Sequence, residues 1–431
     1  MDVDVPAVPI SVVDDVPVAI RESPVVSASA TTDRRTLIAL CFGTFVAALV
    51  FIIPPLFFPQ MARDLQVSVP LLGQIMSTML GLSVVLGLII GPLSDRSGYR
   101  LLILIGLAAA TACLLVFGLA PTFMFLLLAS AAGAVADAGV LGSSFAIAGT
   151  AFVGTAARRA IGWTTAAQAG AAIVGVPLLA AIGTVAGWRV AFVAAGLTAL
   201  TIVVLATLWL PRDQRTRTGP VRLDTILAPY RPLLRDSVMR RLYGATMVGA
   251  VCWNGLLTYL GAFLIEALGL GTGHVGVVYM AAGTGYCIGS LAVGGPLARL
   301  STRRLVVLGY LTTAVLIALA FSARVGTTGS IVLITGTSLM MGVEGVAMTA
   351  LMTAETPTGA GTTMTLSGSL FNLGAAGGSA IGGALLAFSG YQALAIGLPI
   401  FALGAALLSW RSAPLHVDGP RDADTRNGRG L

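Results

Sequence analysis

Two acidic residues lie deep inside long apolar segments of this chain. Of its 18 acidic residues, only Asp137 and Glu344 are placed in this way. Asp137 follows Pro121 by 16 residues and Glu344 follows Gly329 by 15. At 1.5 Å per helical residue, each acid lies roughly 23 Å from the start of its segment. A poorly hydrated crevice favours the neutral form of a carboxyl, so a proton and a ligand can compete for it.

Asp137 and Glu344 are therefore candidates for proton coupling, for substrate binding or for both, because ionisable residues inside a membrane span are commonly functional. A hydrogen bond to a neighbouring helix is the alternative interpretation of each acid. Neutral polar and aromatic residues in other apolar segments are candidates to complete a substrate cavity, with packing between helices as their alternative role: Gln168, Trp253, Asn254, Tyr259 and Asn372. No arginine lies in the middle of a segment, which favours an apolar or cationic ligand over an anion.

The composition indicates which elements must position these residues. The 431 residues are 56% hydrophobic and 10% charged, with a mean hydropathy of +0.93. Soluble domains have about 25% charged residues, so this is the composition of a polytopic membrane protein. Since one span needs about 20 residues, we expect twelve helices, at 36–58, 71–91, 101–119, 122–148, 160–183, 188–210, 242–266, 273–296, 304–322, 329–353, 361–388 and 391–410.

The second half of the chain repeats features of the first. Gly91-Pro92-Leu93 recurs as Gly295-Pro296-Leu297, at an offset of 204 residues. The sequence therefore predicts an all-α membrane protein with two pseudo-symmetric six-helix bundles, at 34–210 and 242–412. A disordered tail (1–33), a basic linker (211–241) and a second tail (413–431) complete the chain. Asp137 and Glu344 lie in corresponding helices, but at an offset of 207.

The arginines set the expected orientation, since positive residues concentrate in cytoplasmic loops. All 25 basic residues are arginine, and 22 of them fall in the tails, the central linker and the loops on that same side. Only Arg63, Arg189 and Arg324 fall on the other side. We therefore expect a multi-pass protein of the plasma (inner) membrane with both termini in the cytoplasm. The basic character is explained by topology, and no nucleic-acid partner is expected.

Cysteine and histidine show no pattern that would support catalysis. The four cysteines lie in apolar runs without metal-ligand spacing, and the two histidines lie near segment ends. The sequence therefore predicts neither a metal site nor a cofactor, and not an enzyme. The N-terminus lacks a basic start followed by an apolar core, so no secretory signal is expected.

The stretch from Gly91 to Arg100, GPLSDRSGYR, resembles the loop between helices 2 and 3 of major facilitator superfamily transporters. A second run, Gly170 to Pro177, resembles the glycine-proline motif of that family's proton-driven exporters, with Gly170, Gly175 and Pro177 as its motif residues. The resemblance covers roughly residues 34–412. It implies a gating role for Gly91, Asp95, Arg96, Gly98 and Arg100, and a cavity lined by helices 1, 4, 7 and 10.

The same resemblance implies a function. We expect proton-coupled export of a small organic compound or drug by alternating access, in the manner of drug-resistance antiporters. Proton-coupled uptake by symport is the alternative. Asp137 and Glu344 would then face each other across the cleft between the bundles. The expected partners are a small-molecule substrate, protons and the lipid bilayer, and a monomer is expected.

Overall fold

The computed structural model describes residues 30–97, 99–141, 143–144, 155–210, 230–322 and 326–411. These residues form helices and turns, and twelve helical spans among them are long and apolar enough to cross a membrane. The predicted all-α class with twelve transmembrane helices is confirmed. The elements of the first half are α1 (Ala30–Leu65), α2 (Val69–Ser97), α3 (Tyr99–Leu119), α4 (Phe123–Ala136), η1 (Asp137–Leu141), α6 (Thr155–Gly170), η2 (Ala171–Gly175), α7 (Val176–Ala186) and α8 (Trp188–Trp209).

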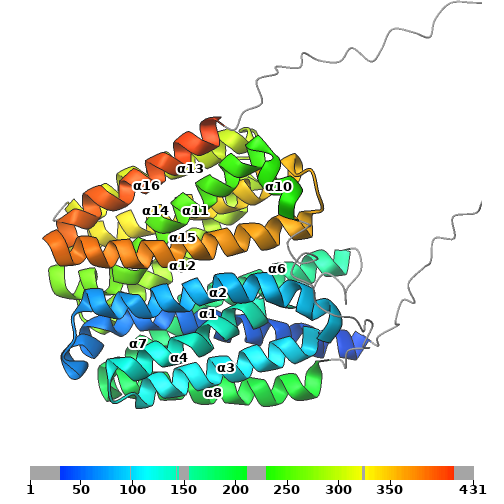
Figure 1. The fold of residues 1–431 in the computed structure, drawn as a ribbon. Coiled ribbons are helices and arrows are strands. Elements are labelled where there is room, and N and C mark those ends of the chain that lie inside the picture. Colours follow the sequence, from blue (N-terminus) through cyan, green and yellow to red (C-terminus); the bar gives the residue numbers. More distant parts are fainter. Residues whose placement is uncertain are drawn as a thin grey trace, which may run out of the picture.

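The second half also has six candidate spans. It contains a short α10 (Arg231–Arg235), α11 (Ser237–Ala262), η4 (Phe263–Ala267), α12 (Thr272–Val293), α13 (Thr302–Ser322), α14 (Gly326–Glu355), α15 (Ala360–Ser389) and α16 (Tyr391–Arg411). Figure 1 shows the two halves as two stacked bundles, with the blue-to-green half below the green-to-red half. Corresponding turns use glycine: Gly187 has φ +83° and Gly390 has φ +68°, conformations that side-chain-bearing residues rarely adopt.

Several expected boundaries differ from the structure. α1, expected at 36–58, begins at Ala30, inside the predicted tail, and runs to Leu65. Two further differences concern predicted loops. The stretch predicted as a loop after residue 91 is helical as far as Ser97, because α2 continues through Pro92. Proline can occupy this place because neighbouring helices satisfy freed backbone groups in membrane bundles. At the other boundary, α11 begins at Ser237, inside the predicted linker, where Asp236 caps it by accepting from the Met239 backbone N–H at 2.8 Å.

The turns define two ends of the bundle. We call the end where α1 begins and α16 ends the terminal end. The other end, with the turns at 66–68, 187, 268–271 and 390, is the distal end. Asp64 ties two distal turns together, since it accepts from Trp188 Nε1 at 2.7 Å and from Arg189 at 2.8 Å.

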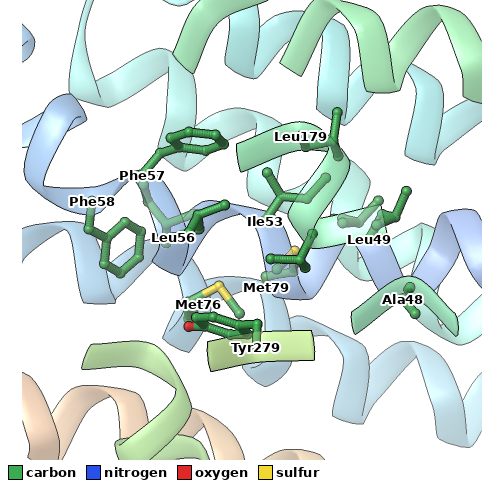
Figure 2. Close-up of a cluster of buried hydrophobic side chains, with 14 of the residues drawn as sticks. Ala48, Leu49, Ile53, Leu56, Phe57, Phe58, Met76, Met79, Leu179 and Tyr279 are labelled. Carbon is green, nitrogen blue, oxygen red and sulfur yellow. The ribbon is translucent and has the colours of Figure 1, made fainter. Parts of the chain in front are cut away.

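A continuous apolar core joins the halves. Its buried residues include Ile53, Leu56 and Phe57 of α1 and Met76 and Met79 of α2, and Tyr279 of α12 belongs to the same cluster although it comes from the second half (Figure 2). In water, buried apolar surface stabilises a fold by about 25 cal/mol per Å². In lipid, the association of helices depends instead on close packing. The stability of the interface between the halves therefore depends mainly on how closely small residues let the helices approach.

Three helix pairs make most of the contact between the halves in the described part of the chain. α15 packs along α2, α12 packs along η2 and α7, and α11 packs on α1, whereas α12 hardly touches α6. The contact is closest near the distal end, where Gln60 of α1 donates to Thr272 of α12 at 3.0 Å. A Cβ built on Gly261 of α11 would lie 2.5 Å from the Pro55 carbonyl oxygen of α1. The halves are therefore pressed together at the distal end and separate along α6 toward the terminal end.

Candidate transport site at the seam between the halves

Asp137 is held in place by a change in helix type. α4 ends at Ala136, and Asp137 begins a single π-helical turn, η1. Such turns often occur at functional positions because they redirect side chains within a continuous helix. The opposite face of η1 lies close to α3, since a Cβ built on Gly139 would lie 2.9 Å from the Leu102 carbonyl oxygen. A glycine at this position therefore lets the turn pack on α3 while Asp137 faces α2 and α15.

The carboxyl of Asp137 bridges the two halves of the molecule. Asn372 of α15 donates from Nδ2 to Asp137 Oδ2 at 2.8 Å. Ser83 of α2 also hydrogen-bonds the carboxyl, and its hydroxyl lies 3.4 Å from the Ala134 carbonyl oxygen. Asp137 is only 8% exposed. We call Asp137, Asn372 and Ser83 the seam site.

The sequence singled out two of these three residues. Asp137 and Asn372 were predicted separately, and the structure brings them into direct contact. Ser83 was missed, because a serine in an apolar helix has many packing roles and nothing in its spacing distinguishes it from Ser77 of the same helix.

Glu344 occupies a different place. It is 5% exposed and hydrogen-bonds Tyr310 of α13. A Cβ built on Gly309 of α13 would lie 2.8 Å from Glu344 Cβ, so the side chain leaves α14 toward α13. The expectation that Asp137 and Glu344 face each other across one cleft is therefore wrong. The two acids lie in separate polar contacts.

The internal repeat explains the separation. The offset of 204 that aligns the two loops pairs Val140 with Glu344 and Gly106 with Tyr310. In the first half, a Cβ built on Gly106 would lie 2.8 Å from Val140, so Val140 faces α3. Glu344 faces the corresponding helix, α13. Asp137 lies three residues before Val140 inside the π turn η1, and its carboxyl contacts Ser83 of α2 and Asn372 of α15. A similar depth in the two halves therefore did not mean the same helix face.

The remaining predicted cavity residues are dispersed. Asn254 donates to the Ala250 carbonyl of its own helix at 3.3 Å, and Trp253 packs half-buried against the core. Gln168 of α6 is half-buried. Tyr259 is fully buried and donates to the Ser379 carbonyl at 2.7 Å, so it lines no open cavity in this conformation.

Tyr259 instead fills a socket of glycines at the distal end. A Cβ built on Gly73 of α2 would lie 1.8 Å from Tyr259 Oη, and one built on Gly383 of α15 would lie 2.5 Å from it. Gly382 is equally close to the ring, at 2.8 Å. The ring thus belongs to the second half and its socket partly to the first. We call Tyr259, Gly73, Gly382 and Gly383 the distal plug.

The predicted helix 5 motif lies between two neighbouring helices. A Cβ built on Gly175 would lie 2.5 Å from Leu49 of α1, and Pro177 lies against Gly276 of α12, 3.2 Å from a Cβ built there. Gly170 has a looser contact, with Phe45 at 3.8 Å. The motif therefore marks where α1, η2 and α12 meet at the seam.

Most of the predicted gating stretch falls outside what the structure describes. Gly98 is not among the described residues, and of Gly91, Asp95 and Arg96 only their place in α2 is described. Arg100 donates from Nη2 to the Thr207 carbonyl of α8 at 2.7 Å. A surface hollow lies elsewhere, at the distal end, lined by Arg63, Gln66, Glu266 and neighbours. It is remote from both acids.

Comparison with known proteins identifies the family. Residues 40–356 match the sequence profile of the Major Facilitator Superfamily. The chain belongs to this superfamily. An MFS-type efflux pump of Mycolicibacterium smegmatis is 30% identical over 118 residues, which are 27% of this chain and 28% of that relative. The match thus spans little more than a quarter of the relative's length.

Solved structures with the same fold cover nearly the whole transporter. A bacterial homologue of the human lysosomal transporter Spinster, inward-facing and unoccupied, has a TM-score of 0.68 at 16% identity, covering 90% of this chain and 96% of its own. A variant of the nucleoside transporter NupG has a TM-score of 0.69 at 13% identity, covering 88% and 98%. These likenesses confirm the fold.

Proposed function

We propose that this transporter exports a small organic compound in exchange for protons, with Asp137 as the coupling residue. The observation that carries the proposal is the seam site: a buried carboxyl of one half accepts a hydrogen bond from Asn372 of the other half at 2.8 Å. A group that can gain or lose a proton therefore belongs to the contact that must change when the halves move.

The proton changes the strength of this contact. Hydrogen bonds to a charged acceptor are roughly twice as strong as neutral ones. An ionised Asp137 accepts from Asn372, and also from Ser83 when the Ser83 hydroxyl turns away from the Ala134 carbonyl. A protonated carboxyl keeps only neutral hydrogen bonds. The groups that face it, Ser83 from α2 and Asn372 from α15, are neutral. Protonation therefore weakens the bridge between the halves, and deprotonation strengthens it.

Export rather than uptake is favoured by the relative described as an efflux pump. The arginine distribution supports a cytoplasmic terminal end, which is the end where α6 and α12 separate. A seam that parts on that side would admit substrate from the cytoplasm. The carboxyl at the seam and the absence of arginine from mid-span support an apolar or cationic substrate.

The test uses inside-out and right-side-out membrane vesicles with ethidium, a lipophilic cation, as the probe. Antiport predicts that an acid interior drives ethidium into inside-out vesicles containing the transporter. Asp137→Asn should reduce this flux by about tenfold or more, since tenfold corresponds to about 1.4 kcal/mol, the scale of one charge-assisted hydrogen bond. Ser130→Ala is the matched control. Ser130 is buried in α4, before Asp137 in the chain, but its hydroxyl donates to the Leu127 carbonyl of its own helix.

Two results would contradict the proposal. Equal proton-driven flux in Asp137→Asn and in Ser130→Ala would remove the coupling role of Asp137. Accumulation that occurs only in right-side-out vesicles with an acid exterior would replace export by uptake through symport.

A further inference from the structure

Tyr310 stands between two acceptors inside the second half. It is 2% exposed, and its hydroxyl lies 3.3 Å from the Ala245 carbonyl oxygen of α11. The same hydroxyl hydrogen-bonds the Glu344 carboxyl of α14. A single side chain of α13 therefore connects α14 to α11, the helix that carries Asn254 and Tyr259.

The number of hydrogens limits what this group can do. A phenol has one hydrogen to donate, a backbone carbonyl can only accept, and an ionised carboxylate can only accept. If Glu344 were ionised, Tyr310 could donate to the carboxylate or to Ala245 but not to both, and the Ala245 carbonyl would keep only the hydrogen bond of its own helix. If Glu344 carries a proton, it donates to Tyr310, and Tyr310 donates to Ala245. Only the protonated acid allows both contacts of the phenol to be hydrogen bonds at the same time.

We propose that Glu344 and Tyr310 form a proton-binding site inside the second half, separate from the seam site, in which the neutral Glu344 donates to Tyr310 and Tyr310 donates to the Ala245 carbonyl. Loss of the proton turns the Tyr310 hydroxyl toward the carboxylate and releases Ala245. Tyr310 is then the positioning residue that transmits the protonation state of α14 to α11.

A second phenol lies near the acid. Tyr286 of α12 is 36% exposed, and its hydroxyl lies 3.7 Å from a Cβ built on Gly345, next to Glu344. The other titratable groups around the site are thiols, Cys252 near Tyr310 and Cys287 near Tyr286. The groups that face Glu344 from α12 and α13 are thus phenols, and a carboxylate formed there would have no cationic partner among the described contacts.

This inference goes beyond the proposed export function, and it is tested without a substrate. Infrared difference spectroscopy of the purified transporter at neutral pH should show the C=O stretch of a protonated carboxylic acid. Glu344→Gln should remove that band, and Asp137→Asn should leave it in place. The infrared band reports on Glu344 alone. A negative infrared result would therefore contradict this proposal without contradicting proton-driven export, which the flux assay tests.

Tyr310→Phe tests the positioning role. Without the phenol oxygen the acid loses its acceptor, so the carboxylic band should move in frequency. Tyr243→Phe is the matched control: Tyr243 is also 2% exposed, and its hydroxyl also lies 3.3 Å from a backbone carbonyl, that of Thr363. A Glu344→Gln spectrum identical to wild type would overturn the proposal, as would a Tyr310→Phe band at the position found in Tyr243→Phe.

Discussion

At the seam, the amide of half-buried Asn372 donates to the carboxyl of buried Asp137 in the interface between the two halves. Removing one partner leaves the other buried without its hydrogen bond, and such a loss costs about 1–3 kcal/mol. Replacing a residue whose polar group bonds only its own helix should cost less. Two asparagines provide the comparison: Asn372 hydrogen-bonds a residue of another helix, and Asn254 hydrogen-bonds a carbonyl of its own helix.

We therefore predict that Asn372→Ala lowers the thermal unfolding temperature in detergent and strongly reduces proton-driven flux. Asn254→Ala should cause a much smaller change in both, because its Nδ2 donates to Ala250 of the same helix at 3.3 Å. Thermal unfolding followed by fluorescence, together with the vesicle flux assay, measures the two effects. Equal losses in both variants would show that the bridge between the halves has no special role.

The closeness of the contact between α2 and the second half changes along the helix. Near the distal end, Gly73 leaves room for Tyr259, whereas a Cβ built on Gly81 would meet the Ala376 Cβ at an ordinary 3.9 Å. The α2–α15 seam is therefore tightest where the distal plug lies and looser two turns further along. Opening the distal end requires Tyr259 to leave Gly73.

We predict that Gly73→Ala opens the distal end, because its Cβ cannot coexist with the Tyr259 hydroxyl at 1.8 Å. A cysteine placed at Gln60 should react faster with a membrane-impermeant maleimide added from the distal side. Gly81→Ala should leave the rate unchanged. The assay needs the native cysteines replaced first, at Cys41, Cys113, Cys252 and Cys287.

Relief of the overlap is the control for this prediction. Adding Tyr259→Phe to Gly73→Ala removes the hydroxyl, the atom nearest the new Cβ, and keeps the ring in its socket, so maleimide labelling should return toward the wild-type rate. If Gly73→Ala labels no faster than Gly81→Ala, the distal plug does not hold this end closed.

For the molecule as a whole, sequence alone could predict the twelve-helix architecture because hydropathy and the internal repeat each extend over long stretches. It also identified Asp137, Asn372 and Glu344 as polar residues in apolar helices. It could not predict which of them meet. That depends on the direction a side chain takes from its helix, and η1 changes this direction at Asp137 through a π turn that the spacing of residues does not reveal.

The same limit applies to Tyr259 and Tyr310. From the sequence, Tyr259 was a candidate cavity residue, but glycines from two other helices, Gly73 and Gly383, close around it. Tyr310 drew no attention, since its role depends on meeting Glu344 and Ala245 from two further helices. Contacts of this kind arise from the packing of three or more helices, and no local pattern encodes them.

If the two halves move as rigid bodies, the two ends of the α6–α7/α12 seam must change in opposite directions. Spin labels at Trp163 and Ile288 report on the terminal end, and labels at Val185 and Val277 report on the distal end. All four side chains are exposed, so labelling leaves the packing intact. We predict that introducing Gly73→Ala lengthens the distal Val185–Val277 distance and shortens the terminal Trp163–Ile288 distance.

Pulsed electron–electron double resonance on the cysteine-free background measures both distances. A pair of labels within the first half, at the exposed residues Met124 and Val185, is the control, and its distance should stay constant. A longer distal distance with an unchanged terminal distance would mean that the distal plug opens locally. A changed Met124–Val185 distance would mean that the first half deforms. Only a reciprocal change at the two ends fits halves that rock about the seam where Asp137 meets Asn372.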